Sequence, residues 1–178
     1  MKFITAAEAK TWCETRGLKL TKNRTLEYEA VDPFQFSIEF ENAASSRVIS
    51  LADYIVPTWE DVPFRGALMW IRERGIWGDA SENAGAAILT QMRLGNGEEA
   101  PLDIKPGYLF GPEEVIELHS FLLMPMLFGW DAFLIPDGGD YFFFISHDGY
   151  VNVVSCTQQA HALIKNQVSH WSNPSRTS

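Results

Sequence analysis

The residues best suited to chemistry gather around one short turn near the C-terminus. His147, Asp148, Tyr150 and Asn152 lie within six positions of one another, between two apolar runs. An imidazole beside a phenol and an amide can transfer a proton or bind a polar ligand. The Asp148-Gly149 pair predicts a two-residue hairpin turn, because both residues tolerate positive φ. Such a turn pairs His147 with Tyr150 and puts Asn152 on their face, which predicts a ligand site there or, alternatively, a hydrogen-bonded hairpin end.

The two cysteines are weaker candidates. Cys13 and Cys156 lie far apart in the chain, and we expect two buried, reduced thiols. Cys13 follows Trp12 on the apolar stripe of an expected helix. Cys156 precedes the expected start of the last helix, and His161 follows one turn later, which is the only arrangement here that suits a reactive thiolate.

Recognised catalytic and cofactor motifs are missing from the sequence. There is no Gly-x-x-x-x-Gly-Lys-Ser/Thr loop, no Gly-x-Gly-x-x-Gly, no His-Glu-x-x-His, no Gly-x-Ser-x-Gly and no Cys-x-x-Cys. His119, His161 and His170 have no metal-ligand spacing. We therefore assign no catalytic residue, cofactor or metal, although an enzyme built from scattered residues stays open.

Charge is distributed unevenly over a chain of net charge −9. Residues 94–164 hold ten acidic residues and one lysine, whereas residues 1–24 hold six basic and two acidic ones. A negative field of this kind disfavours nucleic acid and anionic membranes and favours a basic protein partner. Glu98, Glu99 and Asp103, in a Gly- and Pro-rich loop over 95–111, are the candidate partner contacts. Simple solubility is the alternative explanation of the charge.

Strands are predicted mainly in the last third of the chain. Two turn signals separate the apolar runs 132–135, 141–147 and 150–154, which predicts a three-stranded antiparallel meander. Alternating aromatic and polar residues predict a further strand over 34–41, with Phe34, Phe36, Ile38 and Phe40 on its buried face. Shorter strands are expected at 18–20, 26–28 and 48–51.

Five helices are predicted from apolar spacing and capping signals. The first begins at a capping box, Thr5 to Glu8, and the third is capped by Ser81. Pro125 is expected to kink or end the fourth helix. The expected helices start near residues 5, 63, 81, 112 and 157, and those in the middle run over 63–74 and 81–94.

The predicted fold is therefore α+β, with an antiparallel sheet covered by about five helices. We expect a single domain over 1–171, which is long enough to bury a core without disulfides, and a disordered tail over 172–178. No secretory signal is visible, and the longest apolar run, 121–130, is about half the length of a membrane span. A cytoplasmic protein is expected.

Two functional hypotheses remain open. The first is a non-catalytic interaction module, of the immunity or regulatory type, whose acidic C-terminal half binds a basic protein. An aromatic-rich, acidic α+β chain of this kind resembles small bacterial immunity proteins in general character. The second is a small-molecule-binding protein, or an enzyme without a motif, with its pocket over His147, Tyr150 and Asn152 and beneath the 95–111 loop. Either a monomer or a homodimer is compatible with the sequence.

Overall fold

The computed structural model describes residues 1–56, 64–74 and 84–172. Its centre is a seven-stranded sheet in which every pair of neighbours is antiparallel. In spatial order the strands are β1 (Lys2–Ile4), β6 (Gly107–Phe110), β5 (Ala67–Glu73), β7 (Asp131–Pro136), β8 (Tyr141–Ser146), β9 (Tyr150–Ser155) and β4 (Phe34–Glu39). A separate two-stranded sheet pairs β2 (Leu18–Leu20) with β3 (Leu26–Tyr28).

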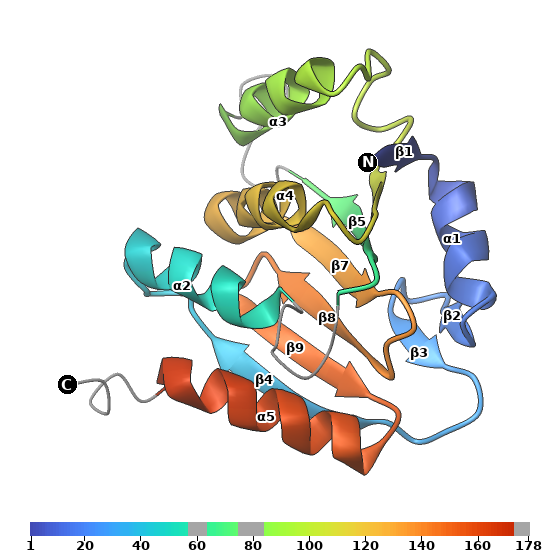
Figure 1. Ribbon diagram of the computed structural model, residues 1–178, viewed down its shortest axis with the longest axis vertical. Coiled ribbons are helices and arrows are strands. Elements are labelled where there is room, and N and C mark those ends of the chain that lie inside the picture. The colour runs from blue at the N-terminus through green and yellow to red at the C-terminus, as the bar shows by residue number, and fades with distance from the viewer. Residues whose placement is uncertain (57–63, 75–83, 173–178) are drawn as a thin grey trace.

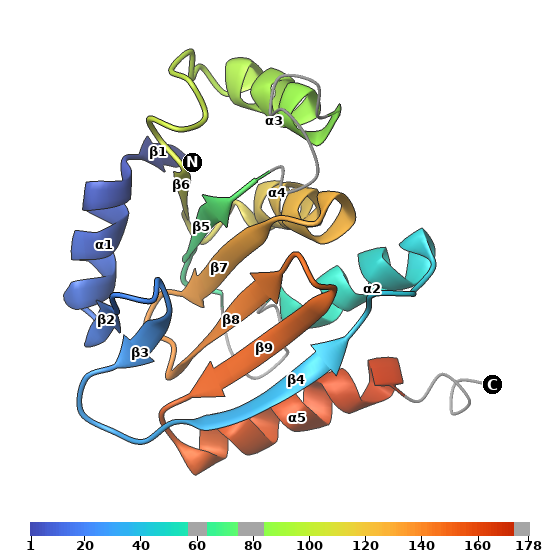
Figure 2. The ribbon, with the colours of Figure 1, turned by 180° about the vertical axis from the view of Figure 1, so that it is seen from behind.

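Five helices accompany the sheet in the described part of the chain, and the α+β class and the expected helix number are confirmed. They are α1 (Ala6–Glu14), α2 (Ser45–Ile55), α3 (Ala84–Gly95), α4 (Val115–Phe128) and α5 (Gln158–Ser172). Figure 1 shows α2, α4 and α5 over one face of the sheet. On the other face, α1, β2 and β3 lie at one end and leave β4 and much of β9 outside their cover (Figure 2).

Each face of the sheet has its own core. The larger core joins the helices to one side of the strands and includes Met69, Leu134 and Phe143. The smaller core lies under α1 and the two-stranded sheet and includes Trp70 and Phe133. The central strands are therefore buried on both faces, which explains why they read as nearly continuous apolar runs.

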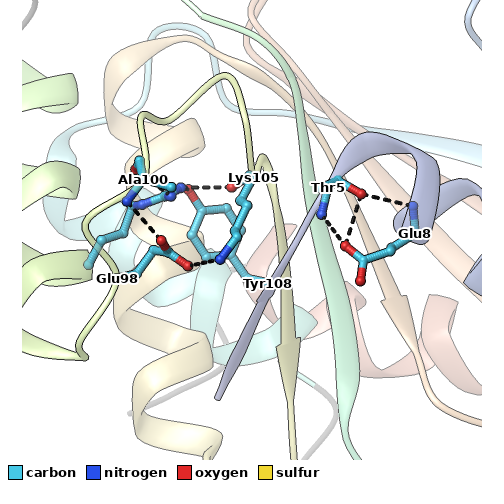
Figure 3. Close-up of polar contacts among 7 residues, drawn as sticks. Thr5, Glu8, Glu98, Ala100, Lys105 and Tyr108 are labelled. Carbon is cyan, nitrogen blue, oxygen red and sulfur yellow. Dashed lines mark hydrogen bonds and ion pairs between the residues drawn. The ribbon is translucent and has the colours of Figure 1, made fainter.

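The first helix begins where the sequence predicts. The Thr5 side chain accepts a hydrogen bond from the backbone N–H of Glu8 at 3.2 Å, and the Glu8 carboxylate accepts one from the N–H of Thr5 at 2.8 Å (Figure 3). This reciprocal capping box satisfies two backbone donors at the start of α1. Ala9 and Cys13 lie on its buried face.

The predicted helix over 63–74 is wrong, because this segment contains the central strand β5. Ala67 through Ile71 are all buried. A strand covered on both faces can match helical spacing by chance, because every position in it is apolar. Residue 63, the expected start of the helix, lies outside the described residues.

The predicted strand over 48–51 is also wrong, because these residues belong to α2. Val48, Leu51, Ala52 and Ile55 are buried on one side of that helix. Leu51, Ala52 and Ile55 follow Val48 by three, four and seven positions, which is the spacing of a helix face. This pattern continues beyond residues 48–51, the four residues that suggested a strand. The helix begins at Ser45.

Smaller differences concern the ends and faces of elements. The expected cap Ser81 lies outside the described residues, and the buried face of α3 includes the charged residue Arg93. Pro125 does not end α4, which continues to Phe128 and is capped by Gly129 at φ 63°. Phe34, expected on the buried face of β4, is 42% exposed. Residues 107–110 of the expected 95–111 loop form β6, and residues 173–178 lie outside the described part.

Candidate binding site beside the β4 edge strand

The turn between β8 and β9 has three residues, not the two predicted. Ser146 pairs with Tyr150, and the N–H of Gly149 donates to the carbonyl of Ser146 at 3.1 Å. Gly149 has φ 80°, the left-handed conformation that three-residue hairpin loops favour. The predicted pairing of His147 with Tyr150 is therefore wrong, and β9 is shifted by one residue relative to β8.

A shift of one residue moves every side chain of a strand to the opposite face. Phe144 is paired with Asn152, and the Phe144 and Tyr150 rings lie 6.4 Å apart. Tyr150 and Asn152 thus point to the sheet face that carries Phe144, away from the helices. Val151 and Val153 are buried in the larger core with Phe143, whereas a two-residue turn would put them on the opposite face.

His147 lies in the turn and is held by a residue that the sequence analysis did not single out as its partner. Oδ1 of Asp131, at the start of β7, accepts the backbone N–H of His147 at 2.9 Å and lies 2.8 Å from its Nδ1. The hydrogen bond with Asp131 raises the pKa of His147, and the charges of Asp131 and Asp148 act in the same direction. No local spacing could indicate this contact, because it depends on the β7–β8 pairing.

The three acidic residues of the 95–111 loop are not equally free to bind a partner. Glu98 accepts a hydrogen bond from Lys105 Nζ at 2.6 Å and another from the N–H of Ala100, and these contacts lower its pKa (Figure 3). Asp103 is paired with Arg74. Glu99 is exposed. Two of the three carboxylates therefore already neutralise cations within the protein.

That loop is also far from the turn. Figure 2 shows it beside β1 and α3, whereas the β8–β9 turn lies toward α2. The predicted cover of His147 by this loop is therefore not what the structure shows.

What lies beside the turn is the outer edge of the sheet. The N–H of Phe40 donates to the carbonyl of Gly149 at 2.7 Å, and the β4–β9 register continues through Ile38 and Val151. In an antiparallel pair, inward-bonding residues alternate with residues whose N–H and C=O point away. Gln35, Ser37 and Glu39 therefore direct their backbone groups outward, where the described chain supplies no further strand.

An open hollow of about 800 Å³ adjoins the end of this edge. We call it the acidic hollow, because Glu39, Glu41 and Asp148 line it against a single cation, Arg47. Arg47 is already engaged, since its guanidinium lies 4.6 Å from the Trp171 ring centre and donates to the Trp171 carbonyl. Tyr150 and Trp171 add aromatic surface to the hollow.

The remaining candidates do not form a reactive site. Burial raises the pKa of Cys13 to about 12, and burial also raises that of Cys156. A thiolate nucleophile needs the opposite shift. His161 lies against the rings of Phe34 and Phe36. Within the described ranges, no group of three potential ligands could hold a metal ion, and no helix is long and apolar enough to cross a membrane.

This chain was compared with known protein families, curated proteins and solved structures. No protein family, curated protein or solved structure matches this chain. The site must therefore be interpreted from its own geometry.

Proposed function

We propose that this protein is a non-catalytic interaction module that binds an extended, basic segment of a partner protein along β4. The partner segment would add an eighth strand to the sheet. This recognition mode uses main-chain hydrogen bonds for affinity and side-chain contacts for specificity.

The observation that carries the proposal is the alternation of bonding along β4. Even-numbered residues bond to β9, so Gln35, Ser37 and Glu39 offer a row of donors and acceptors to an incoming strand. All three residues are exposed. Proteins commonly protect such an edge with proline, a bulge or a covering element, and the six residues of β4 contain no proline.

The charge beside the edge indicates a basic partner. Glu39, Glu41 and Asp148 are exposed, and Arg47, the cation that lines the same hollow, is engaged with Trp171. Opposite charges across an interface accelerate association and select the partner more than they add affinity. The half-buried ring of Tyr150 can also accept a lysine or arginine side chain, whereas the Trp171 ring is already covered by Arg47.

The location differs from the one expected from sequence. Glu98 and Asp103 have cationic partners inside the chain, which makes the 95–111 loop a poor match for a basic protein. Asp148 and Tyr150, which the sequence singled out for a small ligand, line the acidic hollow instead.

The proposal is tested by pull-down of binding proteins from the native host with three forms of the chain: the wild type, an edge variant and a control variant. The edge variant carries Glu39→Gln, Glu41→Gln and Asp148→Asn. The matched control carries Glu98→Gln, Glu99→Gln and Asp103→Asn, so that it loses the same charge elsewhere. We expect one basic protein to be retained by the wild type and by the loop control, released by added salt, and lost from the edge variant.

Two results would contradict the proposal. One is equal capture of the same protein by all three forms. The other is loss from the loop control with retention by the edge variant, which would return the docking surface to Glu98, Glu99 and Asp103.

A further inference from the structure

A second hollow lies on the sheet face opposite the helices, between the β2–β3 turn and strands β5, β7, β8 and β9, and Gln35 of β4 borders it. It has a volume of about 360 Å³, within the range of small-molecule sites. We call it the arginine pocket, because Arg24 and Arg72 both line it. We infer that the arginine pocket binds a small planar aromatic carboxylate, a function separate from partner binding at β4.

The floor of the arginine pocket is aromatic. Phe144 is half-buried at its surface, and Phe133 and Phe142 lie behind it. The Phe133 ring is 5.2 Å from Phe144 and 6.1 Å from Phe142, in tilted and edge-on arrangements. A flat ring can stack on such a floor in the geometry that aromatic pairs prefer.

Arg72 supplies the cation closest to the interior. Its guanidinium lies 4.2 Å from the Trp70 ring centre, and its Nε is buried without a hydrogen-bond partner in the described structure. Burial and the nearby charge of Arg24 both lower the pKa of Arg72. Because this Nε is closed to solvent, a ligand carboxylate would accept from the terminal N–H groups of the guanidinium fork instead.

Arg24 faces the same space from the β2–β3 turn. It has φ 64° and is the only non-glycine residue with positive φ among those described. The turn is closed by Thr21, whose N–H donates to Thr25 at 2.8 Å and whose carbonyl accepts from Arg24 at 3.1 Å. The left-handed conformation lets the chain reverse at Arg24, whose side chain lines the same pocket as Arg72.

Three acidic residues also line the pocket, and none of them pairs with either arginine. Asp131 is held by His147, and Glu27 accepts a hydrogen bond from Thr25 at 3.3 Å. Glu73 is exposed. Two neighbouring guanidinium groups without a carboxylate partner in the described chain favour an anion between them.

Calorimetry with 2-naphthoate tests this inference, with 2-naphthalenemethanol as the neutral analogue of the same shape. We expect one naphthoate per chain and at least tenfold weaker binding of the alcohol. Arg72→Gln should weaken naphthoate binding at least tenfold. Arg16→Gln should leave it unchanged, because Arg16 stacks on Trp12 and pairs with Asp137 outside the pocket.

A second variant keeps the test valid if Arg72→Gln does not fold. Arg24→Gly removes one guanidinium at a backbone position that glycine adopts without strain. We expect weaker naphthoate binding with an unchanged or higher melting temperature, a combination that a purely structural role would not give. Absence of saturable binding, equal binding of the alcohol, or full affinity in both arginine variants would overturn the inference.

Discussion

Asp131 holds His147 through two contacts to a single carboxylate oxygen, one from the backbone N–H at 2.9 Å and one from Nδ1 at 2.8 Å. The pair connects the start of β7 to the β8–β9 turn. It fixes the turn that carries Asp148 and Gly149 against the end of β4, and so it positions one wall of the acidic hollow.

The first prediction concerns the titration of His147. Asp131→Asn removes the charged acceptor, so we expect the pKa of His147 to fall toward its ordinary value. NMR titration of the imidazole signals measures this directly. Asp53→Asn is the control, because Asp53 contacts His119 and not His147. An unchanged His147 pKa in Asp131→Asn would show that the contact is not made in solution.

The same pair predicts the pH dependence of stability. The pKa of His147 is raised in the folded protein. Its stabilising contribution is therefore complete below the unfolded pKa, near 6.5, and is lost as pH rises through the folded value. We expect His147→Gln to reduce the free energy of unfolding by less than about 1 kcal/mol at pH 5.5, since the pair is partly exposed. The reduction at pH 8 should be smaller than the reduction at pH 5.5. A larger loss at pH 8 would contradict this assignment.

The second prediction concerns the glycine of the turn. A Cβ on Gly149 would lie 2.4 Å from Cα of Glu41, and its φ is 80°. Gly17 has a similar φ of 72° but open space around it. We expect Gly17→Ala to cost about 1 kcal/mol, from backbone strain alone, and Gly149→Ala to cost clearly more. Urea unfolding of both variants gives the comparison, and equal costs would mean that β4 does not approach the turn this closely.

The third prediction concerns Arg93, which is 1% exposed. Its guanidinium donates to the carbonyls of Lys105 and Ala100 and to the hydroxyl of Tyr108 (Figure 3 shows the three acceptors). Arg93→Met leaves these groups without their donor, and we expect a loss of about 2–4 kcal/mol in thermal or urea unfolding. Arg93→Lys should recover only part of it, because an ammonium cannot reproduce the planar fork. Full recovery by lysine would contradict that geometry.

The sequence was sufficient for elements whose pattern is local. The capping box at Thr5 and the strands expected over 132–135, 141–147 and 150–154 depend on residues within a few positions of one another, and the structure has these strands at 131–136, 141–146 and 150–155. The α2 and β5 segments were misassigned, because four to eight apolar residues fit a buried strand and a helix face equally well. Only their neighbours in space decide between the two.

The site was less predictable than the fold. The β8–β9 turn has one residue more than predicted, and this reversed the sheet faces of Tyr150 and Val151. A one-residue shift in register moves every side chain of a strand to the opposite face. The contact of Asp131 with His147 depends on the β7–β8 pairing. The shared pocket of Arg24 and Arg72 depends on how the separate two-stranded sheet packs against the seven-stranded one. Neither has a signal in the sequence around it.

The fourth prediction tests which backbone groups of β4 are free. Ser37 directs its N–H outward, so Ser37→Pro removes no hydrogen bond of the sheet, and we expect a loss of less than about 1 kcal/mol. Ile38 directs its N–H to β9, so Ile38→Pro should cost about 3 kcal/mol or more, with Ile38→Ala separating the loss of packing. Circular dichroism melting curves measure all three. A Ser37→Pro variant as unstable as Ile38→Pro would mean that the outward groups are already bonded.

Strand addition at β4 is best tested by amide hydrogen exchange at Gln35, Ser37 and Glu39, measured by NMR with and without a synthetic peptide of alternating lysine and valine. We predict fast exchange at these three amides in the free protein, protection when the peptide binds, and no protection with a peptide of alternating glutamate and valine. Protection already present in the free protein, or binding of the basic peptide without protection at these positions, would contradict strand addition at β4.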